Sequence, residues 1–125
     1  MKLRIKGNSL RFRVTRSELE TFRKQAHIEE TICLGPEQQS HLKYALNHDS
    51  GLKAIQLSYQ PPELSVALPS SEVERWAGSD QVGLYTTLDL GPRGTLDLII
   101  EKDFACLHGT AEENLDAFPN PNLGT

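Results

Sequence analysis

The residues best suited to binding chemistry are cations that alternate with apolar residues near the start of the chain. Residues 2–6 read Lys-Leu-Arg-Ile-Lys and residues 10–14 read Leu-Arg-Phe-Arg-Val. Alternation with a period of two is typical of half-buried strands, whose successive side chains point to opposite faces. In a hairpin of two such strands, the apolar positions would face the core: Leu3, Ile5, Leu10, Phe12 and Val14. The cations would share the opposite face, here called the basic face: Lys2, Arg4, Lys6, Arg11 and Arg13.

Charge is unevenly distributed along the chain. The 125 residues include 13 Lys and Arg and 17 Asp and Glu, for a formal net charge of −4. Residues 1–24 hold eight basic and two acidic residues, so they carry +6 and the other 101 residues carry −10. Clustered cations attract anions, so we expect the basic face to bind phosphates, with DNA as the first candidate. The alternative is a solvated face, or one that pairs with an acidic partner protein or with the chain's own acids.

The C-terminal segment, residues 104–125, contains Glu112, Glu113 and Asp116 followed by the proline-containing run 118–122. Proline disfavours helices and central strands, so we expect this tail to be disordered or to form a strap. Its acids could cover the basic face. Cys106 and His108 are zinc-binding residue types, but no second close pair accompanies them. A metal-binding protein or an enzyme that uses the tail near Cys106 is therefore a further alternative.

Catalytic motifs do not emerge from the sequence. It contains no Gly-x-Ser-x-Gly elbow, P-loop, Gly-x-Gly-x-x-Gly or His-Glu-x-x-His. Asp103, which follows Glu101 and Lys102 at a predicted strand end, is a plausible site position, although such charges are usually solvated. We therefore predict no catalytic residue, metal or cofactor, and favour a small non-enzymatic binding protein.

The elements that position these residues follow from periodicity and turn signals. Gly7-Asn8 suits a tight hairpin between the first two strands, because both residues tolerate positive φ. Capping-box spacing marks two helix starts, at Ser17 with Glu20 or Thr15 with Glu18, and at Ser71 with Glu74. The predicted elements of the first half are strands 2–6 and 10–14, a helix over 16–26, and strands 28–34 and 41–46. Those of the second half are strands 55–59 and 64–68, a short helix near 71–76, and strands 82–90 and 95–101.

The two halves of the chain align with each other almost without gaps, mostly residue i with residue i + 54. Matched pairs include Leu10 with Leu64, Ser17 with Ser71, Phe22 with Trp76, Ile28 with Val82 and Leu42 with Leu96. A two-residue insertion precedes the second of the two Leu-Gly-Pro turns, Leu34-Gly35-Pro36 and Leu90-Gly91-Pro92. We interpret this as an internal duplication with halves at about 1–48 and 53–103, joined by a mostly polar link at 47–52.

Each half alone would leave open strand edges and a thin core. We therefore predict an α+β, mainly β fold, in which two ββαββ halves form one pseudo-two-fold barrel over residues 1–103. Residues 104–125 form the tail or strap. The expected core residues are Leu10, Phe12, Phe22, Trp76, Leu96 and Leu98.

The run of residues 6–15, Lys-Gly-Asn-Ser-Leu-Arg-Phe-Arg-Val-Thr, resembles the start of swapped-hairpin domains of the SpoVT/AbrB type, which include MazE-like antitoxins. Residues 76–82 look like the helix-to-strand junction of those domains. In that family two chains interleave into one barrel, so the resemblance implies that this single chain supplies both halves. It also implies DNA binding through the basic first hairpin. Residues 102–107 are similar to the closing segment of a group of small uncharacterised bacterial proteins.

Composition also bears on the compartment. No apolar run approaches the roughly 20 residues that cross a bilayer, and the charged start does not resemble a signal peptide. Two cysteines, Cys33 and Cys106, do not make a disulfide framework, so we expect both to be reduced. The sequence favours a cytoplasmic protein without membrane partners, as a monomer or homodimer.

Overall fold

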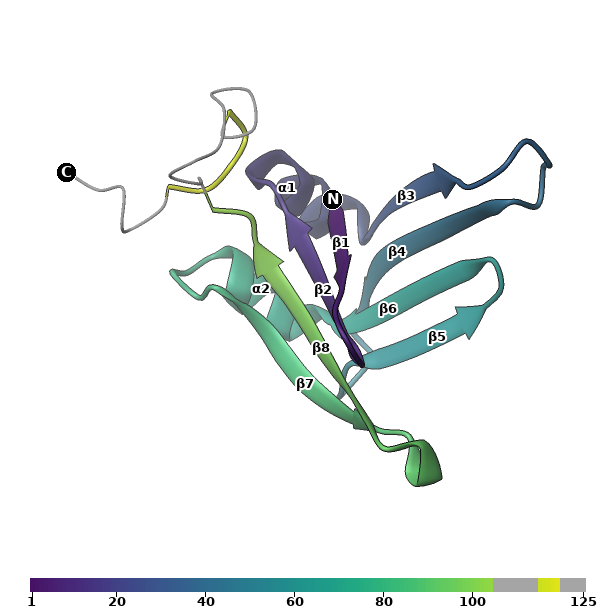
Figure 1. The fold of residues 1–125 in the computed structure, drawn as a ribbon. Coiled ribbons are helices and arrows are strands. Elements are labelled where there is room, and N and C mark those ends of the chain that lie inside the picture. The colour runs from purple at the N-terminus through teal and green to yellow at the C-terminus, as the bar shows by residue number, and fades with distance from the viewer. Residues whose placement is uncertain (105–114, 120–125) are drawn as a thin grey trace. The chain divides into compact units, whose positions relative to one another are not determined.

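A computed structural model describes residues 1–104 and 115–119, which form an α+β, mainly β fold (Figure 1). This confirms the predicted fold class. Neither described helix has the length and apolar character needed to cross a membrane. The elements are β1 (Lys2–Ile5), β2 (Ser9–Val14), α1 (Arg16–Gln25), β3 (His27–Cys33), β4 (His41–Asp49), β5 (Gln56–Gln60), β6 (Glu63–Pro69), α2 (Ser70–Ala77), β7 (Gly83–Asp89), a short 3₁₀ turn (Gly91–Arg93) and β8 (Thr95–Lys102).

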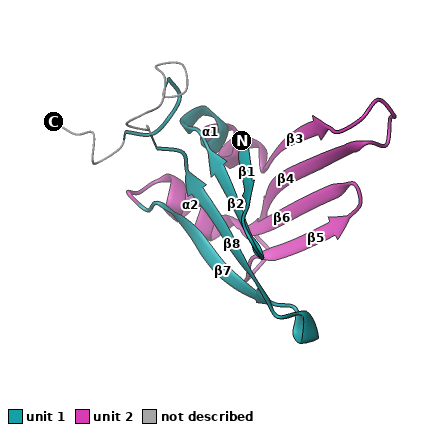
Figure 2. Ribbon diagram, viewed as in Figure 1, with its two compact units in different colours: residues 1–19, 81–125 teal, residues 20–80 magenta. Residues whose placement is uncertain are grey.

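The chain forms two compact units, each with its own four-stranded sheet (Figure 2). Unit 1 comprises residues 1–19 and 81–125, and its strand order is β1-β2-β8-β7. Unit 2 comprises residues 20–80, and its strand order is β3-β4-β6-β5. The described strands therefore form two open sheets of four strands, and neither sheet closes into a barrel.

Each sheet combines one hairpin from each half of the sequence. In unit 1, β2 runs parallel to β8, and in unit 2, β4 runs parallel to β6. The hairpins themselves are antiparallel. The inner strand of each hairpin therefore pairs with a strand that is distant in sequence. The outer strand of each hairpin is an open edge of its sheet.

Strand register recurs between the two halves. The pairs Lys2–Arg13 and Arg4–Arg11 of β1–β2 have their counterparts, at i + 54, in Gln56–Ala67 and Ser58–Ser65 of β5–β6. In the parallel pairs, Ser9 lies opposite Asp97 and Lys43 lies opposite Glu63. In the alignment of the two halves, Ser9 corresponds to Glu63 and Lys43 corresponds to Asp97. The two parallel strand pairs therefore have the same register, with the halves exchanged.

The two-residue insertion lies between α2 and β7. His27 of β3 pairs with Asn47 of β4, and Gly83 of β7 pairs with Glu101 of β8. The offset between corresponding residues is therefore 56 from β3 to β7 and 54 from β4 to β8. Ile28 consequently corresponds to Leu84, and its alignment with Val82 was wrong. Exposure agrees with this correction, because Leu84 is 5% exposed whereas Val82, before β7, is 43% exposed.

The predicted core residues are all buried: Leu10, Phe12, Phe22, Trp76, Leu96 and Leu98. Along β2, buried residues alternate with half-buried ones, as the period of two requires. Ile5 departs from the prediction, because its side chain is 64% exposed. It ends the edge strand β1 beside the turn, where fewer neighbouring side chains can cover it.

The two helix starts differ. Thr15 and Glu18 form a capping box at α1, because the Thr15 amide donates to Glu18 Oε1 (2.9 Å) and the Glu18 amide donates to Thr15 Oγ1 (3.4 Å). The alternative start at Ser17 is wrong, since the helix begins at Arg16. The predicted capping box at Ser71 is also wrong. Pro69 is the N-cap of α2, and no side chain caps that helix.

Helix α1 ends at a strained residue. Ala26 has a φ of 63°, in the left-handed region that favours glycine, and its amide donates to the Phe22 carbonyl at 2.9 Å. Ala26→Gly is expected to raise the free energy of unfolding by roughly 0.5–1 kcal/mol, because glycine adopts this conformation without a Cβ clash. Chemical unfolding measures the change. The matched control, Ala77→Gly at the helical end of α2, should lower stability, and stabilisation by both variants would contradict this explanation.

Candidate anion-binding site

The basic face is assembled on the β1–β2 hairpin of unit 1. Lys2 lies opposite Arg13 and Arg4 lies opposite Arg11. Lys6 and Ser9 close the turn, since each amide donates to the other's carbonyl oxygen at 3.1–3.2 Å. All five predicted cations therefore occupy positions on the same side of the hairpin.

Three of these cations pair with acids from the end of β8. Lys2 Nζ lies 3.1 Å from Asp103 Oδ2, and Asp103 is only 7% exposed. The Glu101 carboxylate is shared, with its Oε1 atom 3.0 Å from Arg13 Nε and 3.5 Å from Arg11 Nη1. The end of the hairpin nearest α1 is therefore compensated within the unit.

The turn end of the hairpin is different. No ion pair joins Arg4 or Lys6 to an acid in the described part of the chain. Together with Ser9 and Arg11, these side chains line a depression of about 110 Å³. The Ser9 hydroxyl donates to the Lys6 carbonyl at 2.6 Å, which fixes the turn beneath the cations. Positive charge thus accumulates where the surface is concave.

Neighbouring strands reduce this charge only in part. Four carboxylates share this face of the sheet: Asp97 and Glu101 of β8, Asp103 just after it, and Asp89 of β7. The five cations therefore leave a net charge of +1. Asp97 lies opposite Ser9, but its Oδ1 atom accepts a hydrogen bond from Thr87 Oγ1 of β7 at 3.0 Å. It does not line the depression.

Tyr85 of β7 is a residue on this face that the sequence did not single out. Its register partner Ile99 is also the partner of Arg11. Burial raises the pKa of its phenol, the Glu101 charge raises it further, and the Arg11 charge opposes both effects. Tyr85 is consequently an uncharged hydrogen-bonding group at neutral pH. The alternation of residues in the sequence could not identify Tyr85 as part of this face, because its position beside Arg11 depends on the pairing of both strands with β8.

The equivalent hairpin of unit 2 lacks the cations. Adding 54 to each cation's position gives Gln56, Ser58, Gln60, Ser65 and Ala67. The shared register shows that these occupy the same places on β5–β6. The basic face is therefore present on one of the two matching hairpins.

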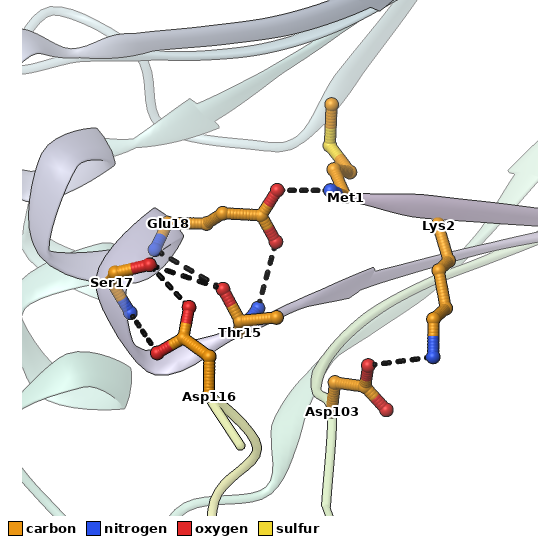
Figure 3. A network of polar contacts seen from close by, with 7 residues as sticks. All are labelled: Met1, Lys2, Thr15, Ser17, Glu18, Asp103 and Asp116. Atoms are coloured by element: carbon orange, nitrogen blue, oxygen red, sulfur yellow. Dashed lines mark hydrogen bonds and ion pairs between the residues drawn. The ribbon is translucent and has the colours of Figure 1, made fainter. Parts of the chain in front are cut away.

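Residues 115–119 form a strap on unit 1 (Figure 3). The Arg16 amide donates to the Asp116 carbonyl at 3.0 Å, and both the amide and hydroxyl of Ser17 donate to the Asp116 carboxylate. The Phe118 amide donates to the Asp103 carbonyl at 2.8 Å, and the Phe118 ring lies 6.1 Å from that of Phe104. These contacts hold residues 115–119 against unit 1.

Of the tail acids considered as partners of the basic face, Asp116 is the one that the structure describes. Asp116 binds the start of α1 and not the basic face. A helix N-terminus favours a carboxylate because its first amides lack intrahelical partners and carry partial positive charge. Cys106, His108, Glu112 and Glu113, on which the metal alternative rested, lie outside the described residues.

The Asp116 contact should make stability depend on pH. Hydrogen bonds from the side chains of Ser17 and Thr15 lower the pKa of Asp116 below its usual 3.8, and the Ser17 amide and Arg16 charge add to this effect. A lowered folded-state pKa means that the charged carboxylate stabilises the fold at neutral pH. This contribution is lost as pH falls below 3.8 and through the folded-state value.

Asp116→Ala is expected to lower the free energy of unfolding by about 1 kcal/mol at pH 7. Its difference from the wild type should be smaller at pH 3 than at pH 7, because pH 3 lies below 3.8, where this contribution begins to be lost. Urea unfolding at both pH values measures the effect. Asp80→Ala removes an exposed carboxylate and is the control. A loss that is equally large at both pH values would contradict the role of the charge.

Histidines and thiols of the described residues supply no competing site. No group of three or more His, Cys, Asp and Glu side chains there is arranged to hold a metal ion. His48 is half-buried and bridges two helices. Its Nε2 donates to the Phe22 carbonyl at 3.0 Å, and its Nδ1 lies 2.7 Å from Ser70 Oγ. Cys33 is an exposed free thiol at the end of β3.

Comparison with protein-family models places the chain in a family. The model of DUF7009, described as a family of unknown function, matches residues 1–122. Comparisons with curated proteins and with solved structures give no match. Since the match extends over both units and the strap, this protein belongs to the DUF7009 family.

Proposed function

We propose that this protein is a small non-enzymatic binding protein whose basic face holds an anionic partner, with duplex DNA as the first candidate. The observation that carries the proposal is the charge at the hairpin turn. Arg4 and Lys6 have no acidic partner among the described residues, and with Arg11 they surround a concave surface. Phosphates are the natural partners of Arg and Lys clusters, and their binding does not require base-specific contacts.

We also propose that the fold is a duplicated swapped hairpin of the SpoVT/AbrB type, in which one chain supplies both halves of a barrel. Two features support this view. Each sheet takes one hairpin from each half of the sequence, and the register of β1–β2 recurs at the equivalent positions of β5–β6. We place the protein in the cytoplasm, where DNA and reduced thiols such as that of Cys33 occur together.

A salt titration of duplex-DNA binding tests the function. If Arg4, Lys6 and Arg11 neutralise three phosphates, log affinity should fall with log salt at a slope of about −2.7. A slope near −4.5 would mean that all five cations are used and that the pairs with Glu101 and Asp103 open on binding. Both slopes support binding by the basic face, and they differ in how many of its cations contact DNA.

Arg4→Ala is expected to reduce the magnitude of the slope by about one, whatever the DNA sequence. Lys24→Ala removes the same charge from α1, where Lys24 pairs with Glu20, and is the matched control. It should leave the slope unchanged. No DNA binding by the folded wild type at low salt would overturn the proposal, and binding of polyglutamate instead would favour an acidic protein partner.

A further inference from the structure

We infer that the depression at the β1–β2 turn binds one phosphomonoester group, the phosphate that ends a nucleic acid strand or a small phosphate ester. The inference rests on the proposed function and deepens it, because it names which phosphate the site prefers. The lining residues are Arg4, Lys6, Ser9 and Arg11. They come from two neighbouring cross-strand rows, Arg4 with Arg11 and Lys6 with Ser9.

The backbone beneath the depression is fixed in place before any ligand binds. Gly7 has a φ of 56°, which a tight turn of this kind requires. The Asp97 amide donates to the Asn8 carbonyl at 3.1 Å, and the Asn8 side chain donates to the Thr95 carbonyl. The turn is thus tied to β8 at its tip. Because the turn is already ordered, little conformational entropy remains to be lost when an anion binds.

Charge balance favours a group with two negative charges. Lys2 and Arg13 each have a carboxylate within 3.1 Å, whereas Arg11 lies 3.5 Å from the Glu101 oxygen that it shares with Arg13. Arg4 and Lys6 are the two cations left without acid partners in the described chain, and both line the depression. A phosphodiester supplies one negative charge, but a phosphomonoester carries about 1.5–2 at neutral pH.

Like charges directly across an antiparallel pair destabilise a sheet, and Arg4 lies directly across from Arg11. A phosphate group between them would relieve this repulsion, and each guanidinium can donate two parallel hydrogen bonds to it. The shallow volume of about 110 Å³ suits one such group and not a run of nucleotides. The base or sugar of a nucleic acid end would then lie outside the depression.

The matching hairpin supplies an internal control. The corresponding residues of β5–β6 are Ser58, Gln60, Glu63 and Ser65. None of these four residues is a cation. One of them, Glu63, is a carboxylate, and its Oε1 atom lies 3.5 Å from Lys43 Nζ. The inference therefore predicts one phosphomonoester per chain, at the β1–β2 turn.

The experiment combines amide NMR with two DNA ligands. Inorganic phosphate, titrated at constant ionic strength, should shift the Gly7 and Ser9 amides saturably and leave those of Ser58 and Ser65 unmoved. A short duplex with a 5′-phosphate should bind about tenfold more tightly than the same duplex with a 5′-hydroxyl, which is one extra charge contact of about 1.4 kcal/mol. This advantage should grow as pH rises through about 6, where the second phosphate proton is lost.

Arg4→Gln should abolish the 5′-phosphate advantage, whereas Lys24→Gln should retain it, and dispersed amide spectra would show that both variants fold. Equal affinity for the two duplexes with no shift at Gly7 and Ser9 would overturn the inference, yet salt-dependent DNA binding would leave the proposed function standing. Saturable phosphate binding without binding of either duplex would support the site and overturn the DNA proposal. Equal shifts at Ser58 and Ser65 would show unspecific ion binding and overturn the inference.

Discussion

A fragment comprising residues 1–50 is expected to be unfolded as a monomer. In the whole chain β2 pairs with β8 and β4 pairs with β6, so the fragment loses every strand partner that the second half supplies. It retains only the two hairpins β1–β2 and β3–β4, and isolated two-stranded hairpins are at best marginally stable. Circular dichroism and size-exclusion chromatography should show either an unfolded monomer or a folded dimer in which two fragments supply each other's missing strands.

Complementation provides the control for this result. Mixing fragments 1–50 and 53–125 should restore strand signal, because the two fragments together contain all four hairpins. The amount of regained signal should rise with protein concentration, as a bimolecular association requires. A fragment 1–50 that is folded and monomeric would contradict the dependence of each sheet on both halves.

Replacement of Trp76 by alanine is expected to cost roughly 3–5 kcal/mol of unfolding free energy. Trp76 is in α2 and is 0% exposed, and α2 contacts both β4 and β6 of unit 2. Removing the indole takes away a large apolar surface and leaves a cavity that the surrounding side chains fill only in part. Such a loss is a large fraction of the roughly 5–15 kcal/mol that typical domains have.

Urea unfolding followed by circular dichroism measures the loss. Trp76→Phe should lose less, because an aromatic ring still fills part of the space. Arg75→Ala, at the exposed neighbouring position, should change stability by less than about 0.5 kcal/mol. Equal losses in Trp76→Ala and Arg75→Ala would show that the tryptophan does not occupy a core position.

The local elements of this chain could be predicted from its sequence because each carries its own signal. Alternation in residues 10–14 shows which side chains of β2 are buried, and Phe12 and Val14 are fully buried as expected. The Gly7 turn and the Thr15 capping box depend on contacts within a few residues. Ala26 shows where this approach ends, since alanine carries no signal for the left-handed conformation that stops α1.

That five cations share one face of a hairpin follows from the alternation of residues alone, since a strand's period of two depends only on backbone geometry. Which of these cations are compensated depends on strands brought together by the fold. Glu101 and Asp103 reach Lys2, Arg11 and Arg13 because β8 runs parallel to β2, a pairing between residues nearly ninety positions apart. That register follows from the packing of whole strands. It ends the charge compensation short of the turn and leaves Arg4 and Lys6 without an acid partner in the described chain.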